Sequence, residues 1–351
     1  MDRPPTTIKG RGAADNPRGR FDALERSREP DAEIAPRPQT FVTLQQARAI
    51  ITRNESPDVP FSQSINPYQG CEHGCIYCYA RPSHAYLGLS PGLDFETRLF
   101  AKENAAELLR DELLRPGYRC EVIALGANTD PYQPIEREHR ITRSILEVLL
   151  EFRNPVGIVT KGSLIERDLD LLAPMAREGL VHVFISIGTL DGEIARTLEP
   201  RAAAPYRRVE TVRRLSGQGV PCGVLAAPII PFLNDRDLES VLEAASEAGA
   251  SMAGYTLLRL PWEVKDLFKD WLERHQPLKA ARVMARIRDS RGGRENDPKF
   301  GSRMKGEGRF AELIRDRFDI ACRRLGLNTG ERNRLDTGKF RRPGTAQRVL
   351  F

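Results

Sequence analysis

The sequence has no apolar run that approaches the roughly 20 residues needed for a membrane-spanning helix. Residues 1–20 also lack the apolar segment of a secretion signal. We therefore expect a cytoplasmic protein. Because disulfides are rare in that reducing compartment, closely spaced cysteines there indicate metal binding or catalysis.

Cysteine and histidine are scarce: the chain of 351 residues has six cysteines and five histidines. The histidines are widely spaced and three of the cysteines are isolated, so the sequence predicts neither a second metal site nor a second cluster. The other three are crowded together. Cys71, Cys75 and Cys78 lie in the stretch NPYQGCEHGCIYCYARPSHAYLGL, which begins at Asn66.

Positive charge is concentrated at one end of the chain, whose formal net charge is +6. Residues 291–351 contain 16 Lys and Arg against 8 Asp and Glu, a net of +8, which leaves −2 for residues 1–290. Such a bias suits contact with phosphate backbones. A solvated basic tail that keeps the protein soluble is the alternative.

Short Val- and Ile-rich runs alternate with helical patterns from Glu121 onward, as expected for parallel strands buried on both faces. The expected strands are EVIALGA, PVGIVTK, VHVFISI, VPCGVLAAPII and SMAGYTLLRL. With a strand near Ser64–Tyr68 and the helix AKENAAELLRDELL, about six βα units result. The sequence thus predicts an α/β fold whose parallel sheet closes partly or fully into a barrel, with ligands at the C-terminal strand ends.

The flanking segments divide the chain into three parts. Residues 1–40, rich in Pro, Arg and Asp, are expected to be disordered or loosely attached. Residues 41–289 form the barrel domain, which opens with a short amphipathic helix over 40–53 and closes with helical residues 261–289. Residues 290–351 form a basic C-terminal extension with one helix that ends at Gly326.

The spacing C-x3-C-x2-C leaves two kinds of metal site open. A structural zinc site needs four ligands, usually as two short pairs, and His73 or His84 could complete one here, as in a zinc-binding nucleic-acid module. A cubane cluster has four irons, each normally held by one thiolate. Three thiolates from one loop would leave one iron free to bind another molecule.

This motif, with Tyr77 directly before its last cysteine, resembles the signature of the radical S-adenosylmethionine (SAM) superfamily. The resemblance covers roughly residues 62–260 and implies a partial (β/α)6 TIM-like barrel. It also implies a 4Fe–4S cluster on Cys71, Cys75 and Cys78, with SAM on the remaining iron. In the family, an external reductant such as flavodoxin or ferredoxin drives cleavage of SAM to a 5′-deoxyadenosyl radical, which abstracts hydrogen from the substrate.

The resemblance places SAM contacts beside the cluster loop and past the strand ends. Family members often carry a Gly-Gly-Glu-like segment after the second strand, where this sequence has Asn128, Thr129 and Asp130. A simple turn is the alternative there. Arg196 and Glu199 follow in ARTLEP and are expected to assist in binding SAM. The candidates are Tyr77, Asn128, Thr129, Asp130, Thr160, Lys161, Ser186 and Arg196.

Within the superfamily, GCEHGCIYCYARP and NTDPYQ are most similar to the branch around spore photoproduct lyase, which repairs a thymine dimer in DNA. That lyase uses a loop cysteine as hydrogen donor, whereas this sequence has Ala127 at the aligned position. Cys120 and Cys222 are alternative donors. We expect radical chemistry on a nucleic acid base, as in DNA repair; modification of RNA, a protein or a small metabolite is the alternative.

The last residues fit the pattern Q-x-x-L-F through Gln347, Leu350 and Phe351. This pattern is similar to the short peptides that dock bacterial replication and repair proteins on the sliding clamp. The two apolar side chains would enter an apolar groove of the clamp. Folding of this end back onto the barrel is the alternative.

Overall fold

The computed structural model describes residues 7–21, 38–330 and 334–343. Within them a seven-stranded sheet has the order β10-β9-β8-β7-β6-β3-β2. Its strands are β2 (Ile51–Arg53), β3 (Gln63–Ile65), β6 (Ile123–Leu125), β7 (Val156–Thr160), β8 (Val181–Ser186), β9 (Cys222–Ile229) and β10 (Met252–Leu257). Neighbouring strands from β3 to β10 are parallel, and only β2 runs antiparallel to its neighbour β3. Because β10 and β2 are separate edges, the barrel is open, as the predicted partial (β/α)6 fold requires.

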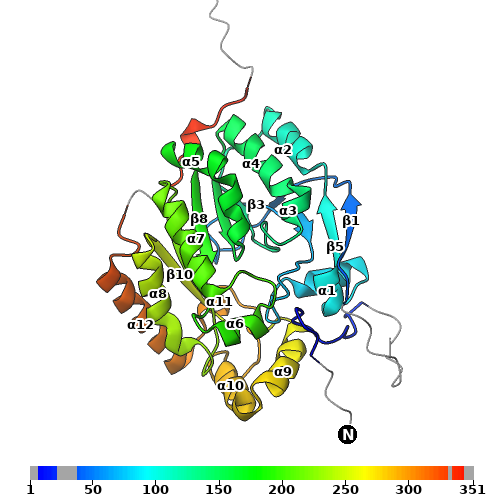
Figure 1. The fold of residues 1–351 in the computed structure, drawn as a ribbon, viewed down its shortest axis with the longest axis vertical. Helices are drawn as coiled ribbons and strands as arrows, with labels where there is room; N and C mark the ends of the chain where they lie inside the picture. Colours follow the sequence, from blue (N-terminus) through cyan, green and yellow to red (C-terminus); the bar gives the residue numbers. More distant parts are fainter. Residues whose placement is uncertain (1–6, 22–37, 331–333, 344–351) are drawn as a thin grey trace, which may run out of the picture.

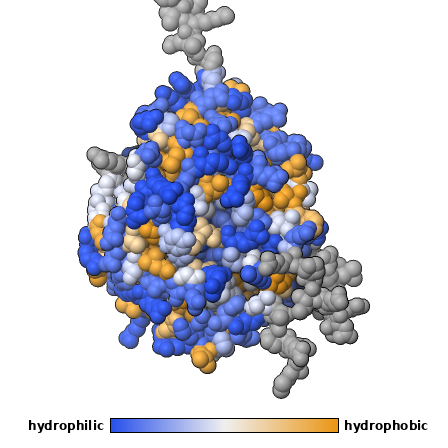
Figure 2. All heavy atoms as spheres, in the orientation of Figure 1, coloured by the Kyte–Doolittle hydropathy of each residue, from blue (hydrophilic) through white to orange (hydrophobic). Residues whose placement is uncertain are grey.

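Helices between the strands cover one face of this sheet (Figure 1). They are α2 (Ala105–Leu114), α4 (Ile141–Phe152), α5 (Leu169–Arg177), α7 (Pro205–Gly217) and α8 (Leu238–Glu247). Their apolar faces and the strands share one buried core. On the face that Figure 2 shows, hydrophobic residues are exposed only in small, separate patches. Among the described residues, none of the helices has the length and apolar character to traverse a membrane.

The helix predicted over residues 40–53 is wrong. Residues there form β1 (Phe41–Gln45) and β2 instead. Strand β1 pairs in parallel with β5 (Arg98–Lys102), which pairs antiparallel with β4 (Tyr68–Gln69). Backbone pairing with segments distant in sequence overrides the helical spacing of the apolar residues.

Residues 7–21, inside the segment expected to be disordered, pack closely on the barrel. Arg11 donates hydrogen bonds to the carbonyl oxygens of Glu96 and Pro38, both at 2.8 Å. Ala13 and Ala14 are buried. Physically, the small side chains let this segment approach the loop that carries the three cysteines, which composition alone did not reveal.

The helices of the C-terminal region lie close to their predicted positions. Residues 261–289 form α9 (Val264–His275) and α10 (Pro277–Asp289), and the extension holds α11 (Ser302–Lys305) and α12 (Gly308–Leu325). Helix α12 ends at Gly326 in the left-handed conformation. Its basic residues are partly used inside the protein, since Arg317 pairs with Glu239 at 2.5 Å. The clamp-like residues Gln347, Leu350 and Phe351 lie outside the described residues.

Candidate active site

The three cysteines lie in a tight loop that follows β4, beside the C-terminal end of β3. Backbone hydrogen bonds fold the loop, from the amide of Gly74 to the carbonyl of Cys71 (3.3 Å) and from that of Cys78 to Cys75 (3.2 Å). Gly74 has φ +65°, and a Cβ there would lie 2.7 Å from a carboxylate oxygen of Glu96. Glycine is therefore required at this turn.

A buried arginine holds the loop from beneath. The guanidinium of Arg81 donates to the carbonyl oxygens of Gly74 (3.0 Å) and Cys75 (2.8 Å) and pairs with Glu96 at 2.5 Å. Both charged side chains are fully buried. The same carboxylate accepts hydrogen bonds from the amides of Gly12 and Ala13. This brace fixes the backbone from which the thiols project.

The thiols suit a multi-iron cluster better than a single ion. Burial raises the pKa of Cys71, Cys75 and Cys78, so a positively charged group is needed to keep all three as thiolates. Within the described ranges, no three His, Cys, Asp or Glu side chains are placed to hold one metal ion. A cubane takes one thiolate per iron and needs no such convergence. The donor set therefore fits a 4Fe–4S cluster, and the amide of Arg81 fixes the backbone at its last thiol by donating to the carbonyl of Cys78 at 3.2 Å.

Asp130 organises the strand ends next to the cluster loop. Its carboxylate accepts hydrogen bonds from the Thr160 hydroxyl (2.6 Å) and the Lys161 amide (2.7 Å), and Nδ1 of His73 lies 3.3 Å away. Burial alone would raise the pKa of Asp130, but the adjacent His73 and these hydrogen bonds lower it to about 2. The carboxylate thus links the ends of β6 and β7 to the loop.

Lys161 is brought to the same place with two of the other predicted residues. Its Nζ donates to the Ser186 hydroxyl at 2.7 Å and lies 6.0 Å from the centre of the Tyr77 ring. The carboxylate of Glu199 is 3.8 Å from Nζ and accepts hydrogen bonds from Tyr77 and Arg208. Among the described residues this ammonium group has one close carboxylate, and it lies near Cys75 and Cys78, so it can bind a further anionic group.

Three of the predicted residues take other positions. Thr129 is buried and donates to the carbonyl of Tyr68 at 2.8 Å. The backbone amide of Asn128 donates to the side-chain oxygen of Asn66 at 3.0 Å. Arg196 lies on the solvent side of α6 (Gly192–Leu198), with a side chain 73% exposed and paired with Glu193. The structure does not bring Arg196 into the group around Lys161.

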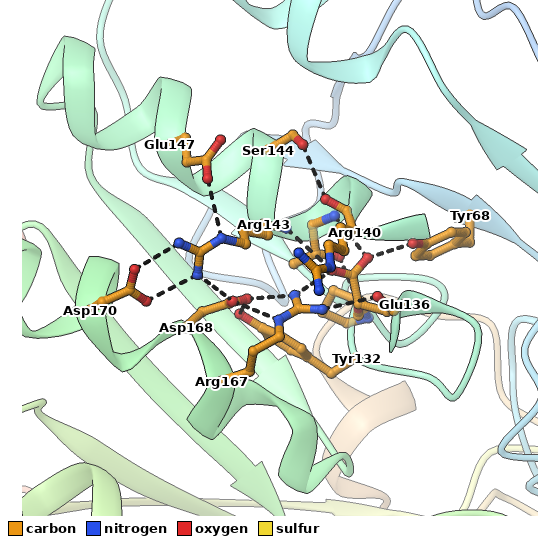
Figure 3. A network of polar contacts seen from close by, with 12 residues as sticks. Tyr68, Tyr132, Glu136, Arg140, Arg143, Ser144, Glu147, Arg167, Asp168 and Asp170 are labelled. Atoms are coloured by element: carbon orange, nitrogen blue, oxygen red, sulfur yellow. Dashed lines mark hydrogen bonds and ion pairs between the residues drawn. The ribbon is translucent and has the colours of Figure 1, made fainter. Parts of the chain in front are cut away.

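A buried network of charges supports the loop after β6 from behind (Figure 3). Glu136 accepts from the Tyr68 hydroxyl (2.5 Å) and pairs with Arg167 at 2.6 Å. Arg167 also pairs with Asp168, which accepts from Tyr132 at 3.1 Å. The network therefore ties the strand before the cysteines to the loop that carries Asp130.

The two alternative hydrogen donors lie at the end of the sheet opposite to the cysteine loop. Cys222 is the first residue of β9 and Cys120 precedes β6. Both are therefore at the N-terminal strand ends, whereas the cysteine loop adjoins the C-terminal ends. Since β9 has eight residues, and each rises about 3.3 Å, the sulfur of Cys222 is far from the site. Neither thiol is placed to act there.

Sequence reasoning missed several residues that shape the site. Two buried ion pairs are among them. Arg81 and Glu96 are 15 residues apart in the sequence, and Arg208 and Glu199 are 9 residues apart. His73 was considered only as a zinc ligand, although it faces Asp130. The one available signal in the sequence was a charged residue close to the cysteine motif, as Arg81 is.

The chain matches the family model described as Radical SAM superfamily over residues 65–245. It is 38% identical over 221 residues to uncharacterized proteins of Mycobacterium bovis and Mycobacterium tuberculosis, covering 62% of this chain and 65% of theirs. It is 26% identical over 194 residues to the FeMo cofactor biosynthesis protein NifB of Klebsiella pneumoniae, covering 51% of this chain and 39% of that protein. The chain thus spans less than two thirds of the length of these relatives.

Among solved structures, spore photoproduct lyase complexed with dinucleoside spore photoproduct superposes with a TM-score of 0.58. The match covers 82% of this chain and 80% of the lyase at 15% identity, which establishes a shared fold. The predicted resemblance is confirmed by the family match and by this fold. The chain belongs to the radical SAM superfamily.

Proposed function

We propose that the protein is an enzyme that reductively cleaves SAM and directs the resulting radical to a nucleic acid base. The observation that carries the proposal is the loop of three cysteines, two of them buried and Cys78 half-buried, held against the C-terminal strand ends by Arg81 and Glu96. In this family the cluster and SAM together supply a 5′-deoxyadenosyl radical. The chain's own residues position these groups and keep water from them.

Cys71, Cys75 and Cys78 would hold the cluster through one sulfur each. Lys161 would bind the carboxylate of SAM, because its ammonium faces the loop and is oriented by Ser186. Asp130 holds Thr160 and the backbone of Lys161 in place. Buried aromatic and aliphatic side chains, with Tyr77 and Ile76 nearest, exclude water from the sulfurs.

Two features support a nucleic acid base as the substrate. Over four fifths of its length the fold is that of a lyase solved with a dinucleoside lesion. Basic and aromatic side chains also meet at the C-terminal strand ends, where the Arg282 guanidinium lies 3.9 Å from the centre of the Phe232 ring after β9. Such pairs favour stacking of bases and contact with phosphates. Residues of the basic extension would add DNA contacts.

The test is anaerobic incubation of the reconstituted protein with SAM and dithionite, with 5′-deoxyadenosine as the readout. We expect its formation, and stimulation by single-stranded or lesion-containing oligonucleotides. Absence of 5′-deoxyadenosine from protein with a full cluster would overturn the proposal. Stimulation by tRNA, a peptide or a small metabolite alone would retain the radical chemistry and replace the substrate.

A further inference from the structure

Arg259 lies just past the C-terminal end of β10, at the same end of the parallel strands as the cysteine loop. Its backbone is fixed on both sides. The amide of Leu258 donates to the carbonyl of Ile229 at 3.0 Å, and Arg291 donates to the carbonyls of Leu257 (3.2 Å) and Leu258 (2.8 Å). Leu258 and Leu260 are buried. The scaffold therefore sets the direction of the Arg259 side chain.

The guanidinium of Arg259 has almost no partners of its own. Its Nη1 lies 3.5 Å from the sulfur of Met304, which is a weak acceptor. Its Nε is buried and has no hydrogen-bond partner within the described part of the chain. No carboxylate there lies within ion-pair distance of Arg259. Its basic neighbour Arg303 is different, because it pairs with Asp58 at 2.5 Å and donates to Ser56 at 2.6 Å.

An unmatched, half-buried cation is unfavourable, since desolvation is offset only by a partner of opposite charge. Burial and the positive charge of Arg303 together lower the pKa of Arg259, and the more distant Asp58 and Asp297 offset this only in part. The attraction of an anion that lies between or against the guanidinium groups would offset both effects. The site is therefore prepared for an anionic group that the chain itself does not supply.

The neighbouring side chain connects this cation to the radical site. Tyr79 follows the last cysteine of the motif, and its hydroxyl donates to the carbonyl of Ala127. Its ring is about half exposed, and the Arg259 guanidinium carbon lies 5.7 Å from the ring centre. A flat aromatic surface beside a planar cation suits a base and its phosphate.

We propose that Arg259 binds a phosphate group of the substrate, next to a base that lies against Tyr79. This inference rests on the proposed function, because phosphate is the anion that accompanies every nucleotide. A carboxylate of a peptide or a metabolite has similar chemistry, and the experiment separates the two. Guanidinium and phosphate form paired, charge-assisted hydrogen bonds, which explains why arginine stands here.

The test measures binding, so that it does not depend on turnover. The probes are a thymidine dinucleotide with a phosphodiester link and the same dinucleotide with an uncharged methylphosphonate link. The proteins are the wild-type holoprotein, Arg259→Gln, Arg259→Lys and the control Arg110→Gln on α2, whose side chain pairs with Glu151 on the outer layer of helices. Because hydrogen bonds between charged groups contribute about 1.5–3 kcal/mol, Arg259→Gln should weaken phosphodiester binding about 10- to 100-fold.

The methylphosphonate should bind the wild type as weakly as the phosphodiester binds Arg259→Gln, and Arg259→Gln should not weaken it further. Arg259→Lys should restore part of the affinity, and Arg110→Gln should leave it unchanged. Equal phosphodiester binding by wild type and Arg259→Gln would overturn the subsite and leave the proposed function standing. A drop in both Arg259 variants together with a lower unfolding temperature, and an equal drop for the methylphosphonate, would also overturn it.

If neither dinucleotide binds the wild type, the nucleotide substrate is wrong and the subsite is judged separately. Inorganic phosphate and succinate are then titrated into wild type and Arg259→Gln. Tighter binding of phosphate by the wild type would retain an anion site for another phosphorylated substrate. Tighter binding of succinate alone would overturn the phosphate assignment in favour of a carboxylate. Equal, weak binding of both by both proteins would overturn the site altogether.

Discussion

The hydroxyl of Tyr77 donates a hydrogen bond to Glu199, a buried carboxylate that also pairs with Arg208. The pair joins the cysteine loop to the C-terminal end of α6, where the amide of Ile76 donates to the carbonyl of Leu198 at 3.0 Å. Burial opposes ionisation of Glu199, but Arg208 and Lys161 lower its pKa and keep it charged. Glu199 thus sets the position of both the loop and Lys161.

Glu199→Gln should destabilise the protein strongly. The substitution leaves Arg208, whose side chain is 2% exposed, without a matching negative charge. Removing one partner of a buried ion pair costs about 3–5 kcal/mol, and the amide retains part of the hydrogen bonding, so we expect about 3 kcal/mol. Urea unfolding measures the change in the free energy of unfolding. The control is Glu193→Gln, whose carboxylate is 88% exposed and should change little; equal values for both variants would contradict the role given to Glu199.

Cys75→Ala should abolish the iron–sulfur cluster. With two thiolates left, the loop cannot retain a cubane that already leaves one iron without a protein ligand. Iron and sulfide content and the visible spectrum after anaerobic reconstitution are the measurements. Cys222→Ala is the matched control. That thiol lies at the N-terminal end of β9, away from the cysteine loop, so the variant should keep a full cluster. A normal cluster in Cys75→Ala, or zinc in place of iron in the wild type, would refute the assignment.

Glu166 predicts a pH dependence of stability away from the cluster. Its carboxylate accepts from Arg207 at 2.7 Å and from Thr211 at 2.7 Å, and Arg214 lies 3.1 Å away. Burial would raise the pKa of Glu166, but these contacts outweigh it and lower the pKa. A lowered carboxyl pKa stabilises the folded state above the unfolded pKa of about 4.3, and this contribution is lost as the pH falls through the folded value.

Glu166→Gln should therefore be less stable than the wild type at pH 7 by about 1.5–3 kcal/mol, the range for hydrogen bonds to charged groups. The difference should remain constant down to about pH 5 and shrink below about pH 4. Free energies of unfolding of both proteins across this range, at equal cluster content, provide the measurement. A difference that grows in acid would show that the sign of the pKa shift is wrong.

The parts of the fold that the sequence predicted are those with a local signal. Strands β7 and β8 are buried or half-buried on both faces, so their runs are rich in Val and Ile, and the cysteine motif is compact by itself. The signal fails where a partner is remote. Strand β1 exists because it pairs with β5, more than fifty residues later, and Arg11 is ordered by contacts to Glu96. Glu199 was expected only beside the SAM candidates, and its buried pairing with Arg208 has no signal in the sequence, because Arg208 is one of several arginines on the same helix.

The packing of residues 7–21 yields the last prediction. Gly12 lies so close to the cysteine loop that a Cβ there would collide with the carbonyl oxygen of Gly74. Its amide also donates to Glu96 at 3.0 Å, and this carboxylate holds Arg81 under the cysteines. Overpacking of a tight contact typically costs about 1–3 kcal/mol. Gly12→Ala should therefore detach the segment.

Hydrogen exchange followed by mass spectrometry is the measurement, with faster exchange of the amides of Gly12 and Ala13 as the expected result. The loop beneath should also loosen, since Glu96 loses two donors, and the reconstituted cluster should bleach faster in air. Gly117→Ala is the matched control, because a Cβ at Gly117 meets no atom within 4 Å. Unchanged exchange in Gly12→Ala would mean that the segment is not held by this contact, whereas faster exchange with an equally durable cluster would limit its role to covering the loop.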